Sequence, residues 1–267
     1  MFKNISIIGS GNLTQAILSG IRNINSRIVI QLFDKNKNRI SIAKKFSCNF
    51  SSQINNSLLK SNIILLAVKP NQYHEVCEQL NAHIDKSIPI VSLMAGVKIK
   101  NINSIFLYKL QLARVMTNIN VKYNNASTFI YSNKLYTKKN QNSLFDFFKL
   151  LGSVYSAKSE EYIDKATALS GSGPAYFIYF LESVIKTYIN LGFSRKLAED
   201  LAKELFYGTS VLCKNDKRNN IEIIKSIASK GGTTQAALEK MHSLDFKNIL
   251  SKSVIMALIK AKALGSK

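Results

Sequence analysis

The chain has 267 residues, of which 46% are hydrophobic and only three are proline, so we expect one or two ordered globular domains. Its net charge of +21 is typical of nucleic-acid-binding proteins, but Lys outnumbers Arg 31 to 6 and the lysines are scattered along the chain. We therefore expect a solvated basic surface and no nucleic-acid partner. No uncharged apolar run reaches the length of about 18 residues that a membrane helix needs, so we expect no membrane span.

The first part of the chain alternates short apolar runs with amphipathic segments. Runs rich in Ile, Val and Leu predict strands covered on both faces at 4–9, 27–33, 62–68, 88–93 and 112–116. Segments of helical length lie between them, at 12–24, 36–46 and 72–82. A more polar run at 126–132 is expected to add an edge strand. This pattern predicts an α/β domain over residues 1–159, built on a doubly wound parallel sheet.

Residues 160–267 show the hydrophobic periodicity of helices, which predicts a second domain without strands. The expected helices are 160–169, 174–191, 195–213, 219–228, 234–242 and 245–264. The helix at 174–191, with Pro174 at its start and Gly192 at its end, is apolar on nearly every face. Such a helix has to be enclosed. We expect a subunit interface to enclose it, the alternative being burial within its own domain.

The turn at Gly9 and Gly11 follows the first strand and opens a helix, which is the context of a dinucleotide-binding turn. A purely structural turn is the alternative. Asp34 ends the second strand, where a carboxylate binds the adenosine ribose of NAD. Lys35 and the two cations that follow it, at 37 and 39, would instead neutralise the 2′-phosphate of NADP, so charge alone does not choose between the cofactors. An exposed helix start would explain the lysines equally well.

Several other site types find no support in the sequence. The histidines are isolated, and no Ser or Cys motif forms a nucleophilic triad with them. The three cysteines are far apart and lack the spacing of metal ligands, so we expect no metal site and reduced thiols in a cytoplasmic protein. Nothing near the start resembles a signal peptide. The chemistry would then belong to a nicotinamide, with a substrate that accepts hydride without a strong protein acid.

The motifs together resemble those of pyrroline-5-carboxylate reductase, the last enzyme of proline biosynthesis, over essentially the whole chain. The matching stretches are IIGSGNLTQAILSG (7–20), LLAVKPNQ (65–72), SLMAGV (92–97), RVMTN (114–118), ALSGSGPAYFIYFLE (168–182) and GGTTQAALEKM (231–241). The resemblance implies a Rossmann-like N-terminal domain and an all-helical C-terminal dimerisation domain, in a homodimer that often assembles further into a decamer. It also implies that NADPH, or less often NADH, reduces the cyclic imine 1-pyrroline-5-carboxylate to L-proline.

The resemblance also implies positions for the site residues. The residues expected to bind the cofactor are Gly9, Gly11, Asn12 and Leu13 at the pyrophosphate, Asp34, Lys35 and Asn56 (or Asn55) near the adenosine, Ala67, Val68 and Lys69 after the 62–68 strand, and Ala95 and Asn118 near the nicotinamide. The substrate carboxylate is expected at Gly231, Gly232, Thr233 and Thr234. Thr234 would be the catalytic residue, as the hydrogen-bond partner of the imine nitrogen. Either threonine could instead be only the N-cap of the helix that follows.

Three residues depart from the family pattern. Ile119 and Asn120 stand where the family usually has Thr and Pro, and Lys230 replaces the usual proline before the glycine pair. Lost prolines reduce loop rigidity without removing a contact that the reaction needs. An alternative to an active reductase is a catalytically silent nucleotide-binding relative. Only the departure at Ile119 and Asn120 supports it. A β-hydroxyacid dehydrogenase would share the first turn but would not explain the SGSGPAY and GGTT motifs.

Overall fold

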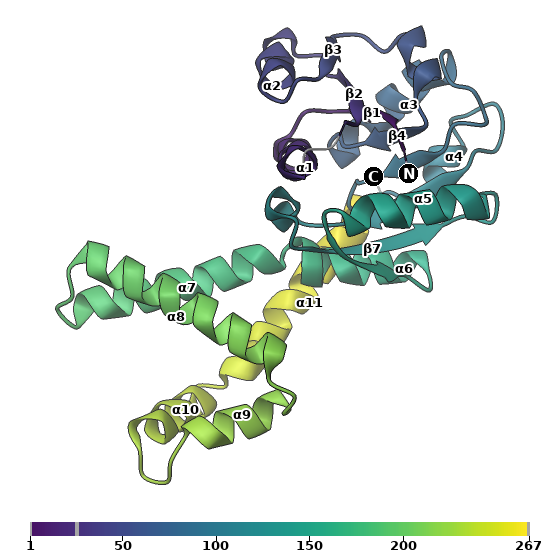
Figure 1. Cartoon of the computed structure of the whole chain (residues 1–267). Helices are drawn as coiled ribbons and strands as arrows, with labels where there is room; N and C mark the ends of the chain where they lie inside the picture. The colour runs from purple at the N-terminus through teal and green to yellow at the C-terminus, as the bar shows by residue number, and fades with distance from the viewer. Residues whose placement is uncertain (1, 25–26, 266–267) are drawn as a thin grey trace. The chain divides into compact units, whose positions relative to one another are not determined.

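The computed structural model describes residues 2–24 and 27–265. Its described residues form two compact units, Met1–Pro174 with Met256–Lys267, and Ala175–Ile255. The first unit carries the sheet and the second consists of helices (Figure 1).

The sheet has eight strands in the order β3-β2-β1-β4-β5-β6-β7-β8. The strands are β1 (Asn4–Ile8), β2 (Val29–Phe33), β3 (Asn49–Ser51), β4 (Ile63–Leu66), β5 (Ile90–Ser92), β6 (Leu112–Met116), β7 (Ala126–Ser132) and β8 (Gly152–Ser156). All neighbours are parallel except the antiparallel pair β6 and β7. The first six strands have the order of dinucleotide-binding sheets, which confirms the predicted doubly wound fold.

The predicted edge strand is wrong in one respect. The run 126–132 does form β7, but β8 pairs with it in parallel on its outer side and takes the edge. The five residues of β8 are half-buried or exposed and include two serines, so their sequence lacks the apolar run that identified the other strands. The short polar strand β3, at the opposite edge, was missed for the same reason.

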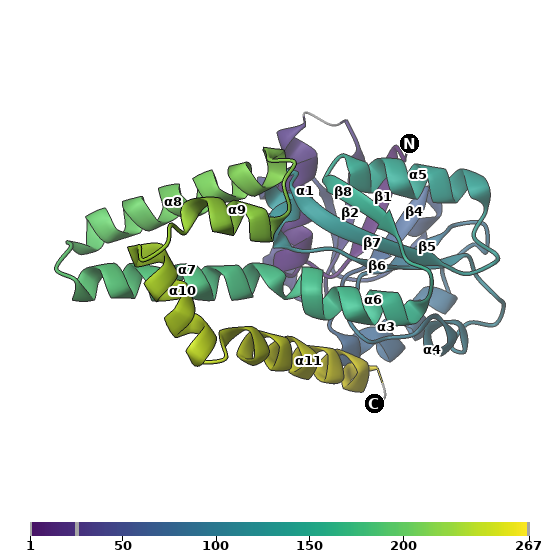
Figure 2. The same cartoon turned by 90° about the horizontal axis from the view of Figure 1, so that it is seen from below.

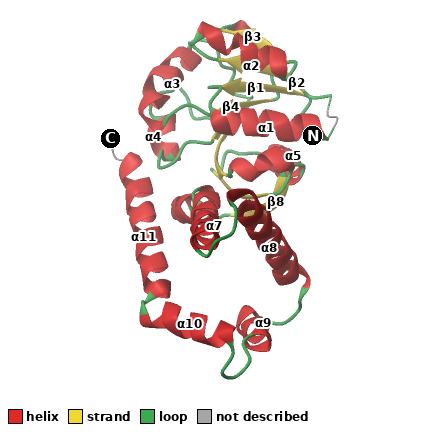
Figure 3. Ribbon diagram, turned by 90° about the vertical axis from the view of Figure 1, so that its left-hand side faces the viewer, coloured by secondary structure: helices red, strands yellow, loops and turns green. Residues whose placement is uncertain are grey.

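Two layers of helices cover the sheet, because alternate residues of its central strands point to opposite faces. In β4, Ile63 and Leu65 join one core cluster and Ile64 and Leu66 join the other. The first cluster also takes side chains from α1 (Asn12–Asn23), α2 (Ile40–Lys45) and α5 (Lys138–Lys149), and the second from α3 (Tyr73–Asn81) and α4 (Ile99–Asn103). Figure 3 shows these helices on either side of the strands. The prediction of strands covered on both faces is confirmed.

Four short 3-10 turns connect these elements, and one π-helical turn follows the sheet. The 3-10 turns are Lys37–Arg39, Asn56–Lys60, Pro70–Gln72 and Ile119–Tyr123. The predicted helix at 160–169 forms as α6 (Glu160–Ala166), which then widens into a π-turn at Thr167–Gly171. Both lie in the first unit with the sheet.

The remaining helices are α7 (Gly173–Asn190), α8 (Arg195–Asn215), α9 (Asn220–Ile227), α10 (Thr233–Ser243) and α11 (Phe246–Leu264). Helices α7 and α8 form an antiparallel hairpin (Figure 2), in which Ile185 packs on Ala198 and Ala202. The apolar helix is not buried within its own chain, because Phe177, Tyr179 and other large side chains of α7 are well exposed. Within the described residues, no helix is long and apolar enough to cross a membrane.

Candidate functional site

The turn after β1 is held in a shape that a side chain at its first position would disturb. Gly9 has φ of +97°, and its N–H donates to the Phe33 carbonyl at 2.8 Å. A Cβ on Gly9 would lie 2.7 Å from the Ala67 carbonyl oxygen. The hydroxyl of Thr14, at the position of the fingerprint's third glycine, donates to the Gly9 carbonyl at 2.7 Å and closes the turn.

Helix α1 begins immediately after this turn with no side chain capping it. Gly11 is the N-cap, and it cannot accept hydrogen bonds through a side chain. The backbone N–H groups of the first helical turn, beginning at Asn12 and Leu13, are therefore left for a ligand. A Cβ on Gly11 would meet nothing within 4 Å, so the space beside the N-cap is open. This is the geometry of an anion site.

The carboxylate of Asp34 ties the end of β2 to the glycine turn. Its Oδ2 accepts from the Ser10 N–H at 2.9 Å and from the Ser10 hydroxyl at 2.5 Å, and its Oδ1 accepts from the Asn36 N–H at 3.0 Å. Each oxygen thus already has a protein donor. Asp34 therefore has a structural role, because it holds the end of β2 against the glycine turn. Its position after the strand did not predict this role.

A cleft of about 320 Å³ opens at the carboxyl ends of β1, β2 and β4. Ligands of doubly wound sheets bind at this edge. The expected cofactor residues that line it are Gly9, Gly11, Asp34, Lys35, Ala67, Val68 and Lys69, whereas Asn12 and Leu13 are not part of the lining. The cleft is also lined by Asn36, Arg39, Ser52 and Ile54. Ser52 and Ile54 follow the three-residue strand β3, which is too short and polar to be recognised from the sequence, so neither residue was expected at the cleft.

Asn56 lies outside this lining. Its side-chain oxygen is 2.8 Å from Nδ1 of His83, so the amide faces a neighbouring loop. Asn55 caps the 3-10 turn, with its side-chain oxygen accepting from the Ser57 N–H at 3.0 Å. The structure therefore brings Ser52 and Ile54 to the cleft where the resemblance indicated an asparagine.

Ala95 and Asn118 do not line the cleft either, and both lie near Met116. Ala95 packs against a small cluster that contains Met116, Ile163 and Ala166. Asn118 is buried, and its amide donates to the Ser170 carbonyl at 3.1 Å and to the Ser170 hydroxyl oxygen at 3.3 Å. Ala95 thus packs beside the end of β6, and Asn118, two residues beyond that strand, is bonded to the π-turn.

The departure at residue 120 has a structural consequence. The side-chain oxygen of Asn118 accepts from the Asn120 N–H at 3.0 Å and caps the 3-10 turn that follows. A proline at 120 would have no N–H to donate. Asn120 therefore adds a hydrogen bond that fixes which way the Asn118 amide points.

The Gly-Gly-Thr-Thr turn begins α10. Gly231 has φ of +73°, and its N–H donates to Oε1 of Gln235 at 2.8 Å. Gly232 is the N-cap, so Thr233 and Thr234 are the first two helical residues and neither of them caps the helix. The N-cap interpretation of the threonines is therefore wrong. Within the described residues neither threonine hydroxyl makes a hydrogen bond, and the helix start lacks any side-chain cap.

Within residues 2–24 and 27–265, no three His, Cys, Asp or Glu side chains lie close enough together to bind a metal ion. Of the histidines, His83 contacts Asn56 and His74 pairs with Glu78 at 3.3 Å on the surface. All three cysteines are free thiols.

Comparison with known proteins gives two family models along the chain. Residues 160–264 match the model described as pyrroline-5-carboxylate reductase dimerisation. Residues 4–96 match the model described as NADP oxidoreductase, coenzyme F420-dependent. A pyrroline-5-carboxylate reductase of Staphylococcus epidermidis is 29% identical over 263 residues, which cover 97% of each chain.

The solved structures agree with the sequence matches. The NADP-bound pyrroline carboxylate reductase of Plasmodium falciparum superposes with a TM-score of 0.89 at 26% identity, covering 98% of each chain. The pyrroline-5-carboxylate reductase of Coxiella burnetii gives 0.87, with the same identity and coverage. The chain is a homologue of the pyrroline-5-carboxylate reductases. The resemblance in the motifs is confirmed, and it extends to the family's dimerisation model over residues 160–264.

Proposed function

We propose that the protein is an NADPH-dependent imine reductase that converts 1-pyrroline-5-carboxylate to L-proline. The observation that carries this proposal is one chain with two uncapped, glycine-containing helix starts, one at Gly11 and one at Gly232. The near full-length match to reductases of this name supports it. The first helix start suits the pyrophosphate of a dinucleotide, and the second suits the single carboxylate of the substrate.

The residues around the cleft fit a nicotinamide dinucleotide. The N–H groups at Asn12 and Leu13 would bind the pyrophosphate, and the ends of β1 and β4, at Gly9 and Ala67, would flank it. Ala95 and Asn118 would border the nicotinamide. When bound, the cofactor supplies the hydride.

The adenosine end of the cleft favours NADPH over NADH. Arg39 and Asn36 line it beside Lys35, whose Nζ is 3.3 Å from the Glu75 carboxylate. The Asp34 oxygens are held by Ser10 and Asn36, so the carboxylate is drawn into the turn. A guanidinium and an amide are then the groups available to a 2′-phosphate.

The turn of α10 would hold and orient the substrate. Backbone N–H groups at Thr233 and Thr234 point out of an uncapped helix end whose partial positive charge favours a carboxylate. The Thr234 hydroxyl, without a partner among the described residues, would bond the imine nitrogen. A threonine is too weak an acid to protonate the imine, so the proton comes from solvent and the residue contributes orientation.

We also propose a homodimer, with a decamer built from such dimers as its further assembly. Support comes from the apolar side chains that α7 and α8 leave exposed, including Phe177, Tyr179 and Tyr207. Contiguous apolar surface of this kind marks a protein interface. The free thiols are consistent with a reducing compartment, and we place the protein in the cytoplasm.

The test is NADPH oxidation by the purified protein in the presence of pyrroline-5-carboxylate. Turnover no faster than the cofactor-only blank would refute the proposal. Thr234→Ala is expected to lower kcat/KM for the imine on the order of ten- to a hundredfold, because a hydrogen bond to a charged group is worth about 1.5–3 kcal/mol. NADPH affinity should stay unchanged. Thr187→Ala is the matched control, because its hydroxyl bonds only the Ser183 carbonyl of its own helix.

A further inference from the structure

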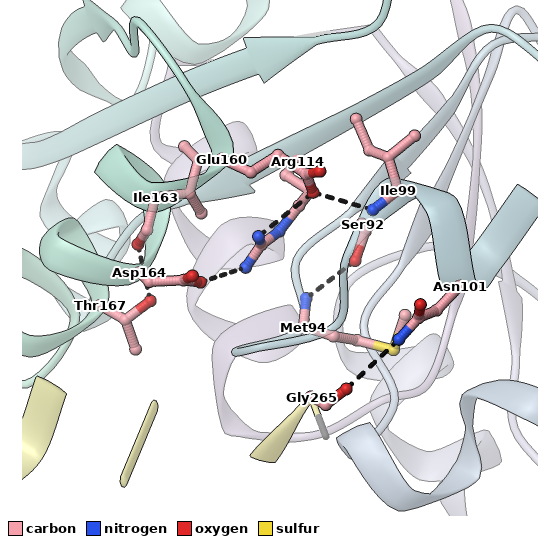
Figure 4. Close-up of polar contacts among 10 residues, drawn as sticks. All are labelled: Ser92, Met94, Ile99, Asn101, Arg114, Glu160, Ile163, Asp164, Thr167 and Gly265. Carbon is pink, nitrogen blue, oxygen red and sulfur yellow. Dashed lines mark hydrogen bonds and ion pairs between the residues drawn. The ribbon is translucent and has the colours of Figure 1, made fainter. Parts of the chain in front are cut away.

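Among the described residues, Arg114 is the largest fully buried side chain, and it lies in the apolar strand β6. A guanidinium stays charged at any physiological pH, so burying it requires anions. Its Nη2 is 2.8 Å from Oδ1 of Asp164 and its Nη1 is 3.3 Å from Oε1 of Glu160 (Figure 4). Nε has no partner within the described residues. In the sequence, the signal for this cluster is an arginine inside an apolar strand, which needs carboxylates from another segment to pair with it.

Glu160 links Arg114 to a second segment. The same Oε1 accepts from the Ile99 N–H at 2.8 Å, and Ile99 is the first residue of α4. Residues 93–98, including Ala95, connect β5 to this point. One carboxylate oxygen therefore fixes the far end of the loop that carries Ala95 to both β6 and α6 (Figure 4).

Asp164 links Arg114 to a third segment. It lies in α6, which continues directly into the π-turn at Thr167–Gly171. Ser170 of that turn accepts from the Asn118 amide and donates through its hydroxyl to the Ser127 carbonyl at 2.8 Å. The helix and its π-turn are thus held at two points of one strand end, Arg114 and Asn118. Single π-turns inside helices are frequent at functional sites.

We propose that Arg114 and Glu160 are positioning residues, which set the loop of Ala95 and the π-turn against Asn118 so that the nicotinamide ring is held for hydride transfer. This rests on the proposed function, which places Ala95 and Asn118 at that ring. Stability alone is a weak reason for the cluster, because buried ion pairs can usually be replaced by apolar side chains without loss. Holding the 93–98 loop and the π-turn in one fixed arrangement, by contrast, requires the several N–H donors that a single arginine provides.

Glu160 is the residue to vary, because removing Arg114 or Asp164 would leave a buried charge unpaired and endanger folding. Glu160→Ala removes the acceptor shared by Arg114 and Ile99 and leaves the Arg114–Asp164 pair intact. Glu160→Gln keeps a side-chain oxygen that can accept from both donors. Glu161→Ala is the matched control, because it makes the same charge change on the next residue, whose partners Lys165 and Lys262 are both exposed.

Four quantities separate positioning from folding: the Kd for NADPH, its binding stoichiometry, the emission spectrum of the bound nicotinamide, and kcat with its primary deuterium isotope effect. For Glu160→Ala we expect wild-type stoichiometry and Kd, an altered emission spectrum, and a kcat lower by about ten- to a hundredfold, the cost of misplacing a reactant by ~1 Å. The isotope effect should rise as hydride transfer becomes rate-limiting. Glu160→Gln should recover most of kcat, and Glu161→Ala should match wild type.

Two results would overturn the proposal. One is a Glu160→Ala protein with wild-type kcat and emission. The other is a loss of activity that only follows a loss of NADPH stoichiometry, as expected if Glu160 merely keeps the chain folded. If the wild-type protein itself fails to reduce the imine, the proposed function fails, and the emission spectra of the NADPH complexes still decide whether Glu160 positions the nicotinamide.

Discussion

Replacing Gly9 with Ala tests how the cofactor turn is built. The backbone at Gly9, with φ of +97°, costs an L-residue about 1–2 kcal/mol. The added Cβ would also lie 2.7 Å from the Ala67 oxygen and 2.9 Å from its carbonyl carbon. Ala67 cannot yield easily, because its N–H donates to the Ile8 carbonyl at 2.8 Å. Overpacking of this kind adds about 1–3 kcal/mol.

The two contributions sum to about 2–5 kcal/mol, which corresponds to a Tm lower by on the order of 4–20 °C for a unit of this size. Gly11→Ala is the matched control for stability. Gly11 has φ of −66°, and its Cβ would meet nothing within 4 Å, so the loss is about 1 kcal/mol or less. Its Cβ would enter the space proposed for the pyrophosphate, so NADPH affinity should fall about tenfold while the fold persists.

Thermal unfolding followed by circular dichroism, together with titration of NADPH fluorescence, distinguishes the two glycines. A Gly9→Ala protein that unfolds at the wild-type temperature would refute the argument from backbone strain. A Gly11→Ala protein with wild-type NADPH affinity would show that the pyrophosphate does not lie in front of this helix.

Three further predictions concern assembly, cofactor choice and thiol reactivity. Tyr179→Asp should reduce the native mass in light scattering, whereas the equally polar change at exposed Tyr123 should not; a Tyr179→Asp protein of unchanged mass would exclude α7 from the interface. Arg39→Ala should weaken NADPH binding about tenfold and NADH binding little, and Lys37→Ala, outside the cleft lining, should change neither. Burial raises the pKa of Cys77 to about 12, so iodoacetamide should label it only in denaturant, and labelling of the native protein would contradict its burial.

Local sequence was sufficient for the elements whose environment is uniform. Strands β1, β4 and β6 are covered on both faces, so their residues are apolar throughout and the runs are visible in the sequence. The edge strands β3 and β8 are half-solvated and polar, so the same reasoning missed both and assigned the edge to β7. Helix ends with capping chemistry were predicted to within a few residues.

The residues of the candidate site also fall into those that local sequence predicts and those that it does not. The glycine turn at Gly9 was identified from the sequence because one short segment contains the strand end, the turn and the helix start. Asn56 was proposed from register with relatives, and the structure turns its amide to His83 and brings Ser52 to the cleft instead. Register in a short, polar segment cannot be settled without the strand pairing that fixes it.

Contiguous stretches of residues were enough to predict the class of sheet, the helical second half, the two glycine turns and the resemblance to pyrroline-5-carboxylate reductases. Only the tertiary structure showed that Asp34 closes the glycine turn, that Gly232 rather than a threonine caps α10, and that Arg114 joins β6 to carboxylates 46 and 50 positions away. These contacts depend on which side chains meet after folding. An arginine in an apolar strand indicates that anionic partners must be present. Which carboxylates pair with it depends on how α6 packs on the sheet.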